Sequence, residues 1–177
     1  MLTELFASKE RLKLLYEILY SDESSVRQLA EDAQVSVGLA SGYLKTLEHF
    51  NLVVKANNKY FVRDSPRSRV LKVLLNLEWI ELDQLAYDWV KGIGLFGSWA
   101  RGENMKGGDL DVWVKVESYP SEFELAKLQR RFTEMTGSET NLLVLTPKKL
   151  DELRARDKPF YYALLRDSIV LRGEGIE

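Results

Sequence analysis

The sequence predicts an α+β protein of two domains. Apolar residues recur at helical spacing in the first 65 residues, which end in a hairpin-like segment. Residues 91–177 instead alternate between strand-like and helix-like runs. Between these parts Pro66, with serines close by on both sides, interrupts the pattern. We therefore expect domains at residues 1–65 and 91–177, joined by a linking helix over residues 66–90.

The composition is that of a globular chain without disulfide bonds. Of 177 residues, 45% are hydrophobic and 29% are charged, the formal net charge is −2, and cysteine is absent. Neither a disulfide framework nor a thiolate metal site can therefore form. Charged residues interrupt the N-terminal segment, which resembles neither a signal peptide nor a membrane span. We expect a cytoplasmic protein with no membrane association.

Three helices and a hairpin are predicted in the first 65 residues. The first helix begins after Ser8, the second covers "SSVRQLAEDA", and the third runs from about Ser36 to Phe50. The apolar face of the first helix is formed by Leu12, Leu15, Ile18 and Leu19. The segment "LVVKANNKYFVR" predicts two strands, because the Asn-Asn pair at its centre tolerates the left-handed conformation of a hairpin turn.

Three helices followed by a hairpin resemble a winged helix-turn-helix domain, over residues 5 to 64. The resemblance implies that the third helix enters the major groove of double-stranded DNA and that the hairpin contacts the backbone or minor groove. The DNA-facing residues that it implies are Ser36, Ser41, Lys45 and His49 on the helix, and Lys55, Lys59 and Arg63 on the hairpin.

The charge of this domain leaves its role open. Residues 1–65 carry eight Lys or Arg and nine Asp or Glu, which is unfavourable for phosphate binding, whereas residues 36–63 carry four basic residues and one acidic residue. The domain either binds DNA, as in a transcription regulator, or packs, dimerises or docks a protein partner.

The expected linking helix has an apolar stripe, formed by Val70, Val73, Leu74, Leu77 and Ile80. Either the two domains of the same chain cover this stripe, or it pairs with a second copy in a homodimer.

A Gly-Ser turn and two aspartates form the most informative motif of the chain. A short apolar strand ends at Gly97-Ser98, where a helix with Ser98 near its cap is expected, and "DLDVWVKV" follows about ten residues later. Alternate residues of a strand point the same way, so Asp109 and Asp111 share one face. Two carboxylates this close favour a bound cation, and Mg²⁺ prefers oxygen ligands. Glycine permits close backbone approach, and amides at a helix start can hold a phosphate.

This motif resembles the signature of the polymerase-β-like nucleotidyltransferases, over residues 90 to 172. The stretch "GSWARGENMKGGDLDVWV" is similar to the minimal subgroup, in which Gly-Ser-x-Ala-Arg-Gly precedes Ser-Asp-hydrophobic-Asp. The resemblance implies a mixed sheet with flanking helices and a nucleoside triphosphate as substrate. It also implies Mg²⁺ or Mn²⁺ as cofactor.

The sequence departs from the family pattern at three positions. Trp99 stands where a basic residue is frequent, and Gly108 stands where serine is usual. The family places a third carboxylate at the start of the third strand, here "SETNLLVLT", where the matching residue is Asn141. An amide cannot accept a proton at neutral pH. Glu139 lies two residues earlier, and a small shift of register would bring it into the site.

Two functions therefore stay open for the second domain. In the first, Asp109, Asp111 and Glu139 hold the metal, Gly97 and Ser98 hold the triphosphate, and Arg101 or Lys106 neutralises it. The enzyme then transfers a nucleoside monophosphate, AMP from ATP, to an acceptor that the sequence does not name. In the second, the domain is catalytically weak or inactive and serves a winged-helix regulator as ligand sensor or scaffold.

Overall fold

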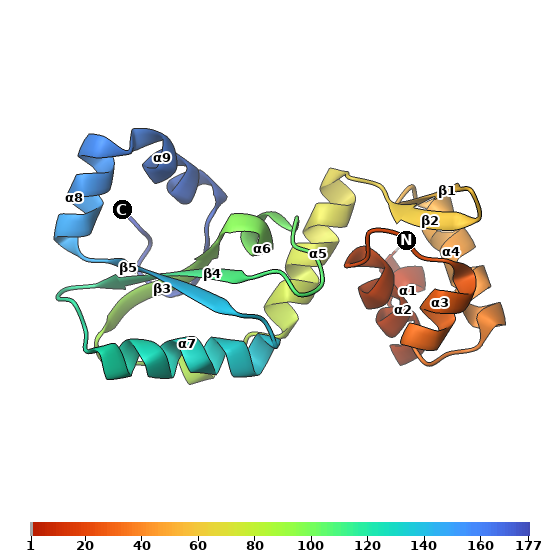
Figure 1. Cartoon of the computed structure of the whole chain (residues 1–177), viewed down its shortest axis with the longest axis horizontal. Helices are drawn as coiled ribbons and strands as arrows, with labels where there is room; N and C mark the ends of the chain where they lie inside the picture. The colour runs from red at the N-terminus through yellow and green to blue at the C-terminus, as the bar shows by residue number, and fades with distance from the viewer. Residues whose placement is uncertain (1) are drawn as a thin grey trace. The chain divides into compact units, whose positions relative to one another are not determined.

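The computed structural model describes residues 2–177, and the chain divides into two units, residues 1–72 and 73–177. The first unit consists of helices and a two-stranded hairpin, and the second is built on a four-stranded mixed sheet with helices (Figure 1). This architecture confirms the predicted α+β class. No helix in residues 2–177 has the length and apolar character needed to cross a membrane.

Serine caps start the main helices of the first unit. Ser8, Ser25 and Ser36 each accept a hydrogen bond from the backbone amide three residues later, which satisfies a free donor of the first turn. The elements are α1 (Leu2–Leu5), α2 (Lys9–Leu19), α3 (Val26–Asp32), α4 (Val37–His49), β1 (Val53–Ala56) and β2 (Lys59–Val62). The third predicted helix is thus confirmed to within one residue at each end.

The predicted hairpin is present and has the expected turn. Asn57 and Asn58 have φ angles of 49° and 63°, and they connect Ala56 to its antiparallel partner Lys59. Two consecutive residues in the left-handed region match the twist of the flanking strands. The structure thus contains the elements of a winged helix, and the identity of that domain stays a prediction.

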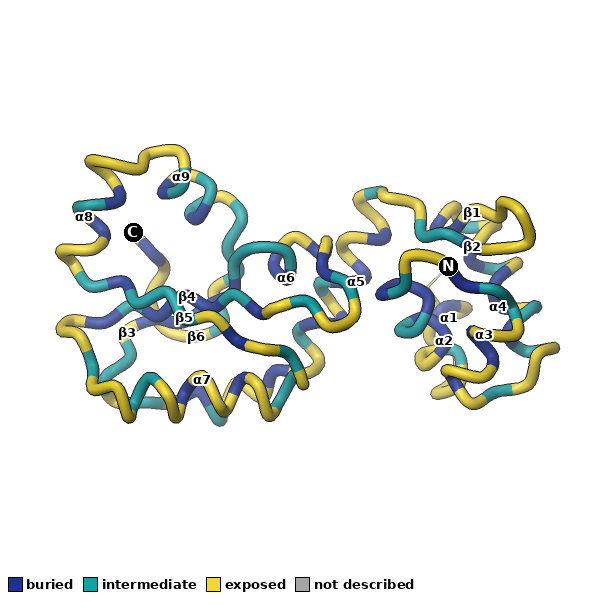
Figure 2. The backbone as a smooth tube through the Cα atoms, in the orientation of Figure 1, coloured by how far each residue is buried: buried dark blue, intermediate teal, exposed yellow. Residues whose placement is uncertain are grey.

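The core of the first unit lies between its helices, and Figure 2 colours the backbone of its buried residues dark blue. They include Leu14, Leu15, Ile18, Leu19, Leu29, Tyr43, Leu44 and Leu47. The prediction for Leu12 was wrong, because it is 40% exposed. Leu14 takes the inward position instead, since it lies four residues before Ile18 on the same side of the helix.

Helix α5 (Pro66–Glu78) is shorter than the helix expected over residues 66–90. A 3-10 turn, η1 (Leu82–Leu85), follows before β3 begins at Val90. Ile80 and Leu85 are both buried in the core beside the sheet. Residues five apart lie on different sides of an α-helix, so a continuous helix could not bury both against one surface.

The apolar stripe predicted for this segment is confirmed at Ile80, which is buried in the core beside the sheet, and at Leu77, which packs against that core, but it was wrong at Val70 and Leu74. Val70 and Leu74 are 67% and 53% exposed, whereas Leu71 and Leu75 are buried. Toward the start of α5, the buried leucines thus lie one residue after the predicted positions, about 100° around the helix axis. Three polar residues of the same helix, Ser68, Lys72 and Asn76, are also buried.

The sheet of the second unit has the strand order β5-β4-β3-β6. Its strands are β3 (Val90–Phe96), β4 (Leu110–Val116), β5 (Thr140–Leu145) and β6 (Ile169–Gly173). β3 pairs antiparallel with β4 and β6, and β4 pairs parallel with β5. The helices are α6 (Gly97–Arg101), α7 (Glu122–Thr136), α8 (Pro147–Arg156) and α9 (Lys158–Asp167). Helix α7 makes the crossover that a parallel strand pair requires.

Helices cover both faces of this sheet. Val112 and Val114 pack in one core with Leu128 and Phe132 of α7. Trp113 faces the other way, into a second core with residues of α8 and α9. Figure 1 shows α7 on one side of the strands and α8 and α9 on the other. The alternation predicted for β4 is therefore confirmed, and Asp111 lies on the same face as Trp113.

Candidate functional site

A glycine with a left-handed backbone forms the turn between β3 and α6. Gly97 has a φ angle of 69°, a region that residues with a Cβ rarely occupy. A Cβ at this position would overlap Oδ2 of Asp111 and lie 3.1 Å from its Cγ. The Gly97 backbone therefore packs directly against the Asp111 carboxylate. This contact fixes the Gly-Ser turn beside the second aspartate of the motif.

Replacing Gly97 by alanine is expected to destabilise the second unit more than the same change at Gly107. Both glycines have positive φ, so each substitution costs about 1–2 kcal/mol of backbone strain. A Cβ at Gly107 meets no atom within 4 Å, whereas at Gly97 it collides with Asp111. Crowding of this kind adds about 1–3 kcal/mol. Urea denaturation of the two variants measures the difference, and equal losses would contradict the described contact.

The two aspartates occupy the start of β4, in the middle of the sheet. Asp111 pairs with Phe96 of β3 on one side and with Asn141 of β5 on the other. Asp109 immediately precedes the strand and is exposed, while Asp111 is half-buried. Within residues 2–177 neither carboxylate forms an ion pair with a basic side chain.

Asn141 lies beside Asp111, as its place in the family pattern implied. Its Nδ2 donates a hydrogen bond to Asp111 Oδ1 at 3.3 Å. Glu139 is exposed, and its backbone carbonyl accepts a 2.7 Å hydrogen bond from the amide of Leu110. Across the described residues, no group of three or more Asp, Glu, His or Cys side chains is close enough to hold a metal ion together.

The donor set fits one divalent cation at the two aspartates. Carboxylate oxygens are the ligands that Mg²⁺ prefers, and this ion commonly takes one or two of them together with water and phosphate oxygens. Asn141 contributes differently, because it presents an amide N–H to Asp111. A donor in that place offsets part of the negative charge of Asp111.

The other predicted nucleotide-binding residues surround the turn. Ser98 is half-buried and is the second residue of α6, two positions after the cap residue Phe96, so it lies near the cap as predicted. Gly97 occupies the first helical position, directly after the cap. Lys106 is exposed in the loop that leads to Asp109, and it interacts within the described chain.

Arg101 lies at the end of α6 among acidic residues. Its Nε donates to Glu103 Oε2 at 2.7 Å. The pKa of the Asp167 carboxyl lies below its ordinary value, mainly because Arg166 donates to it, with a smaller contribution from the charge of Arg101. Arg101 therefore lies near two carboxylates, which lowers the positive charge that it offers to a phosphate.

Trp99 has a structural position that accounts for the loss of a basic residue there. It is 6% exposed and packs in the same core as Val112 and Phe132. A basic side chain in this core would pay a large desolvation penalty. The departure of Trp99 from the family pattern is visible in the sequence, and its burial in the core explains why a basic residue is absent there.

Two asparagines near the site were missed from the sequence. Asn76 of α5 and Asn104 of the loop after α6 are buried and bonded to each other. No motif marks either residue, and they are 28 positions apart. Only the three-dimensional structure brings them together.

The residues predicted to face DNA lie at the surface of the first unit. Six of them are exposed and Ser41 is half-buried; the six are Ser36, Lys45, His49, Lys55, Lys59 and Arg63. The Ser36 hydroxyl caps α4, and Lys59 forms an ion pair with Glu23. Lys55 Nζ lies over the Tyr60 ring and His49 contacts the Phe50 ring, so four of the seven side chains are engaged within the protein.

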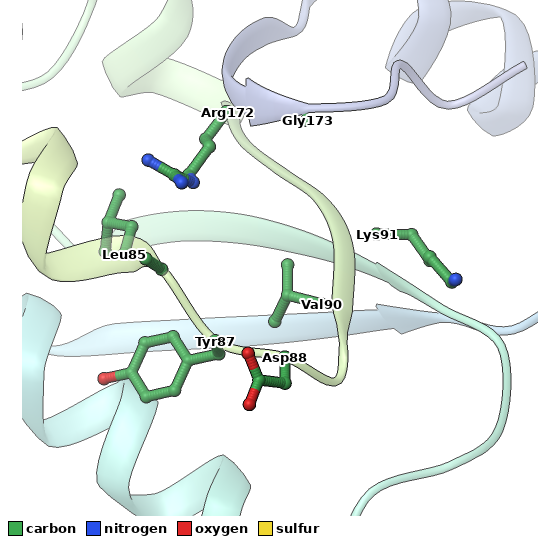
Figure 3. Close-up of a pocket in the computed structure, with 8 residues that line it drawn as sticks. Leu85, Tyr87, Asp88, Val90, Lys91, Arg172 and Gly173 are labelled. Carbon is green, nitrogen blue, oxygen red and sulfur yellow. The ribbon is translucent and has the colours of Figure 1, made fainter.

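A cavity of ≈ 260 Å³ lies at the other end of β3 from the aspartates (Figure 3). Its lining includes Tyr87, Asp88, Val90, Lys91 and Arg172, and none of the predicted site residues. Val90 begins the strand that ends beside Gly97. This cavity is therefore separate from the Gly97–Asp111 turn.

Residues 78–165 match the family model described as "Nucleotidyltransferase domain". This segment, which contains the Gly-Ser turn, both aspartates and Asn141, is the part of the chain that matches the nucleotidyltransferase family. No match is found among curated proteins.

Among solved structures, the chain is similar to several toxin–antitoxin complexes. One with AMP-PNP is 17% identical, with 59% of this chain and 73% of that chain covered and a TM-score of 0.39. A mutant of the toxin–antitoxin MntA-HpeT is 16% identical; the match covers 56% of this chain and 73% of that chain, with a TM-score of 0.41. The complex of a tri-AMPylated HEPN toxin of Shewanella oneidensis with the MNT antitoxin is 15% identical. The match covers 60% of this chain and 73% of that chain, with a TM-score of 0.35. Similarity this remote assigns no activity to the present chain.

Proposed function

We propose that the nucleotidyltransferase domain formed by residues 78–165 transfers a nucleoside monophosphate, AMP from ATP, to an acceptor hydroxyl or amine. The observation that carries this proposal is the packing of Gly97 against the carboxylate of Asp111. It brings together the turn that would receive the phosphates and the aspartates that would hold the cation. The remaining site residues in this proposal are Ser98, Arg101, Lys106, Asp109 and Glu139.

Asp109 and Asp111 would hold Mg²⁺ or Mn²⁺, consistent with two carboxylates that lack a basic partner in residues 2–177. When bound, the ion neutralises phosphate charge and orients the triphosphate. Gly97 lets the phosphates approach the backbone, because it has no side chain on the side of the turn. Ser98 adds a hydroxyl from the first turn of α6.

Glu139 is the carboxylate proposed to assist when substrate is present. The register that pairs Leu110 with Thr140 would, if continued by one residue, place Glu139 level with Asp109. Its side chain is exposed and has room to turn toward the pair.

The proposal is tested by incubating the protein with α-labelled ATP, Mg²⁺ or Mn²⁺ and a panel of acceptors, including the protein itself and proteins of a cell extract. Label should move to an acceptor only with a divalent cation. The other three nucleoside triphosphates serve as comparison. No incorporation from any nucleotide into any acceptor would contradict the proposal.

A second candidate function is binding of nucleotide without transfer, as a sensor or scaffold. The hydrogen bond from Asn141 to Asp111 favours it, since an amide occupies the place of the third carboxylate. The same assay separates the two functions, because a sensor would bind ATP with the cation and leave the label on the nucleotide.

For the first unit we propose binding of double-stranded DNA through α4 and the hairpin, with docking of a protein partner as the alternative. Lys45 and Lys55 are exposed and form no ion pair among the described residues, whereas Lys59 is held by Glu23. Lys55 lies 5.6 Å from the centroid of the Tyr60 ring, and Arg63 is also exposed without an ion pair among the described residues; with Lys45, these two residues carry most of the proposed phosphate contact.

Changing Lys45 and Lys55 to alanine is expected to weaken DNA binding and its dependence on salt. Each phosphate contact adds about 0.9 to the slope of log K against log salt, so the slope should fall by about 2. Fluorescence anisotropy with labelled duplexes at several salt concentrations measures it. Lys9→Ala with Lys13→Ala on α2 is the matched control. An unchanged slope, or no DNA binding at low salt, would favour the protein partner.

A further inference from the structure

Two buried asparagines join α5 to the chain around the Gly-Ser turn. Asn76 is 1% exposed and Asn104 is 4% exposed. Asn76 Nδ2 donates to Asn104 Oδ1 at 3.0 Å, and Asn104 Nδ2 donates back to Asn76 Oδ1 at 3.2 Å. Asn76 Nδ2 also donates to the carbonyl of Trp99 at 2.9 Å. The pair is thus satisfied inside the protein.

These bonds reach both segments that lead to the two aspartates. Trp99 belongs to α6, the helix that begins at Gly97. Asn104 lies in the loop of residues 102–109, which runs from the end of α6 to Asp109. Asn76 therefore holds the turn and the loop with one side chain.

The loop also has other contacts: Glu103 pairs with Arg101, its amide donates to the carbonyl of Ser98, and the amide of Gly108 donates to the carbonyl of Met105. Glu103, Lys106 and Gly107 are exposed, and Gly102 and Gly107 adopt positive φ angles. Asn104 is the deeply buried polar side chain of this segment. A buried amide that loses its partner is left unpaired or must admit water, and both are unfavourable. The pairing of the two amides therefore specifies where the loop lies.

We propose that Asn76 and Asn104 are positioning residues that hold Asp109 and its loop in register with the Gly97–Ser98 turn. The inference deepens the proposed function and rests on it where nucleotide is concerned. Asn76 lies outside the segment that matches the family model, residues 78–165. The helix that precedes the matched segment therefore contributes to the geometry of the site.

The test compares the wild type with a variant carrying both Asn76→Leu and Asn104→Leu. Replacing both partners by apolar side chains of similar size removes the tether without leaving one amide of the pair unpaired, and the Trp99 carbonyl keeps the hydrogen bond from the amide of Gly102. Thr133→Val is the control, because it removes a side-chain hydrogen bond, to Thr140, from α7. A second variant, Asn76→Ala, covers the case in which the two leucines do not fit.

Two readouts separate positioning from a purely structural role. Amide hydrogen exchange in residues 102–109 should accelerate about tenfold or more in the asparagine variants and stay unchanged in the control. The affinity for ATP with Mg²⁺, measured by calorimetry, should fall about tenfold or more, as when a supporting partner of a metal ligand is lost. Thermal unfolding monitors the fold in parallel.

Unchanged exchange in the loop would overturn the proposal, and so would faster exchange with unchanged ATP affinity. If the wild type binds no ATP, the proposed function fails. In that case the exchange measurement still decides whether the two asparagines hold the loop.

Discussion

The variant Asp109→Asn with Asp111→Asn is expected to lose nucleotidyl transfer, by about 100-fold or more. A bound cation contributes several kcal/mol to transfer of a charged phosphoryl group, and each 1.36 kcal/mol corresponds to a tenfold change in rate. The amides keep the shape of the side chains and remove both negative charges. Asn at position 111 can still accept the hydrogen bond from Asn141. The measurement is the rate of label transfer from α-labelled ATP.

The matched control for this variant is Asp83→Asn with Asp151→Asn. Both aspartates are exposed in the second unit, on η1 and α8, and the net charge changes by the same amount. Full activity in the control and loss in the site variant would assign the effect to the pair on β4. Equal rates in the two variants would exclude Asp109 and Asp111 as metal ligands.

Asn141→Asp is expected to increase the transfer rate about tenfold or more. Aspartate restores a carboxylate beside Asp111, where Asn141 Nδ2 now lies 3.3 Å from Asp111 Oδ1. A carboxylate adds a metal ligand and a group that can accept a proton, and general-base assistance is worth about 10²–10⁴-fold. Asn141→Ala is the control, since it removes the amide without adding charge. An aspartate variant no faster than the alanine variant would contradict this account.

The same change should make the stability of the second unit depend on the cation. Two carboxylates on adjacent strands repel each other, at a cost of about 1 kcal/mol. Without a divalent ion the Asn141→Asp protein should therefore unfold a few degrees below the wild type. Mg²⁺ should reverse this loss, because an ion that binds only the folded state stabilises it.

The local chemistry of the chain predicted several features well. The cap at Ser8, the start of the third helix near Ser36 and the Asn57-Asn58 turn follow from interactions with near neighbours in the sequence. The inward alternation of Val112 and Val114 in β4 follows from the two-residue period of a strand. Features of this kind need no knowledge of the rest of the fold.

Features that depend on tertiary packing were predicted less well. The spacing of apolar residues in α5 gave a face with Val70 and Leu74, yet the buried face contains Leu71 and Leu75. Hydropathy alone cannot tell these faces apart, because both carry leucine at helical intervals and the inward face also includes a polar residue. The surroundings of the helix decide which face is buried.

In the candidate site, too, the local motif could be predicted from the sequence, whereas the contacts made by tertiary packing could not. The motif pointed to Gly97 and Asp111, but it did not predict that a side chain at position 97 would overlap the Asp111 carboxylate. The Asn76–Asn104 pair left no signal at all in the sequence. Buried amides bond to whatever the fold places opposite them, so a single sequence does not reveal their partners.

The central claim is that Gly97 and the two aspartates form a site for a nucleoside triphosphate with a divalent cation. Isothermal titration calorimetry of the full chain with ATP, with and without Mg²⁺, tests it most directly. We expect binding that requires Mg²⁺ and disappears in the Asp109→Asn, Asp111→Asn variant. Absence of binding to the wild type in the presence of Mg²⁺ would contradict the claim, and with it both the transferase and the sensor.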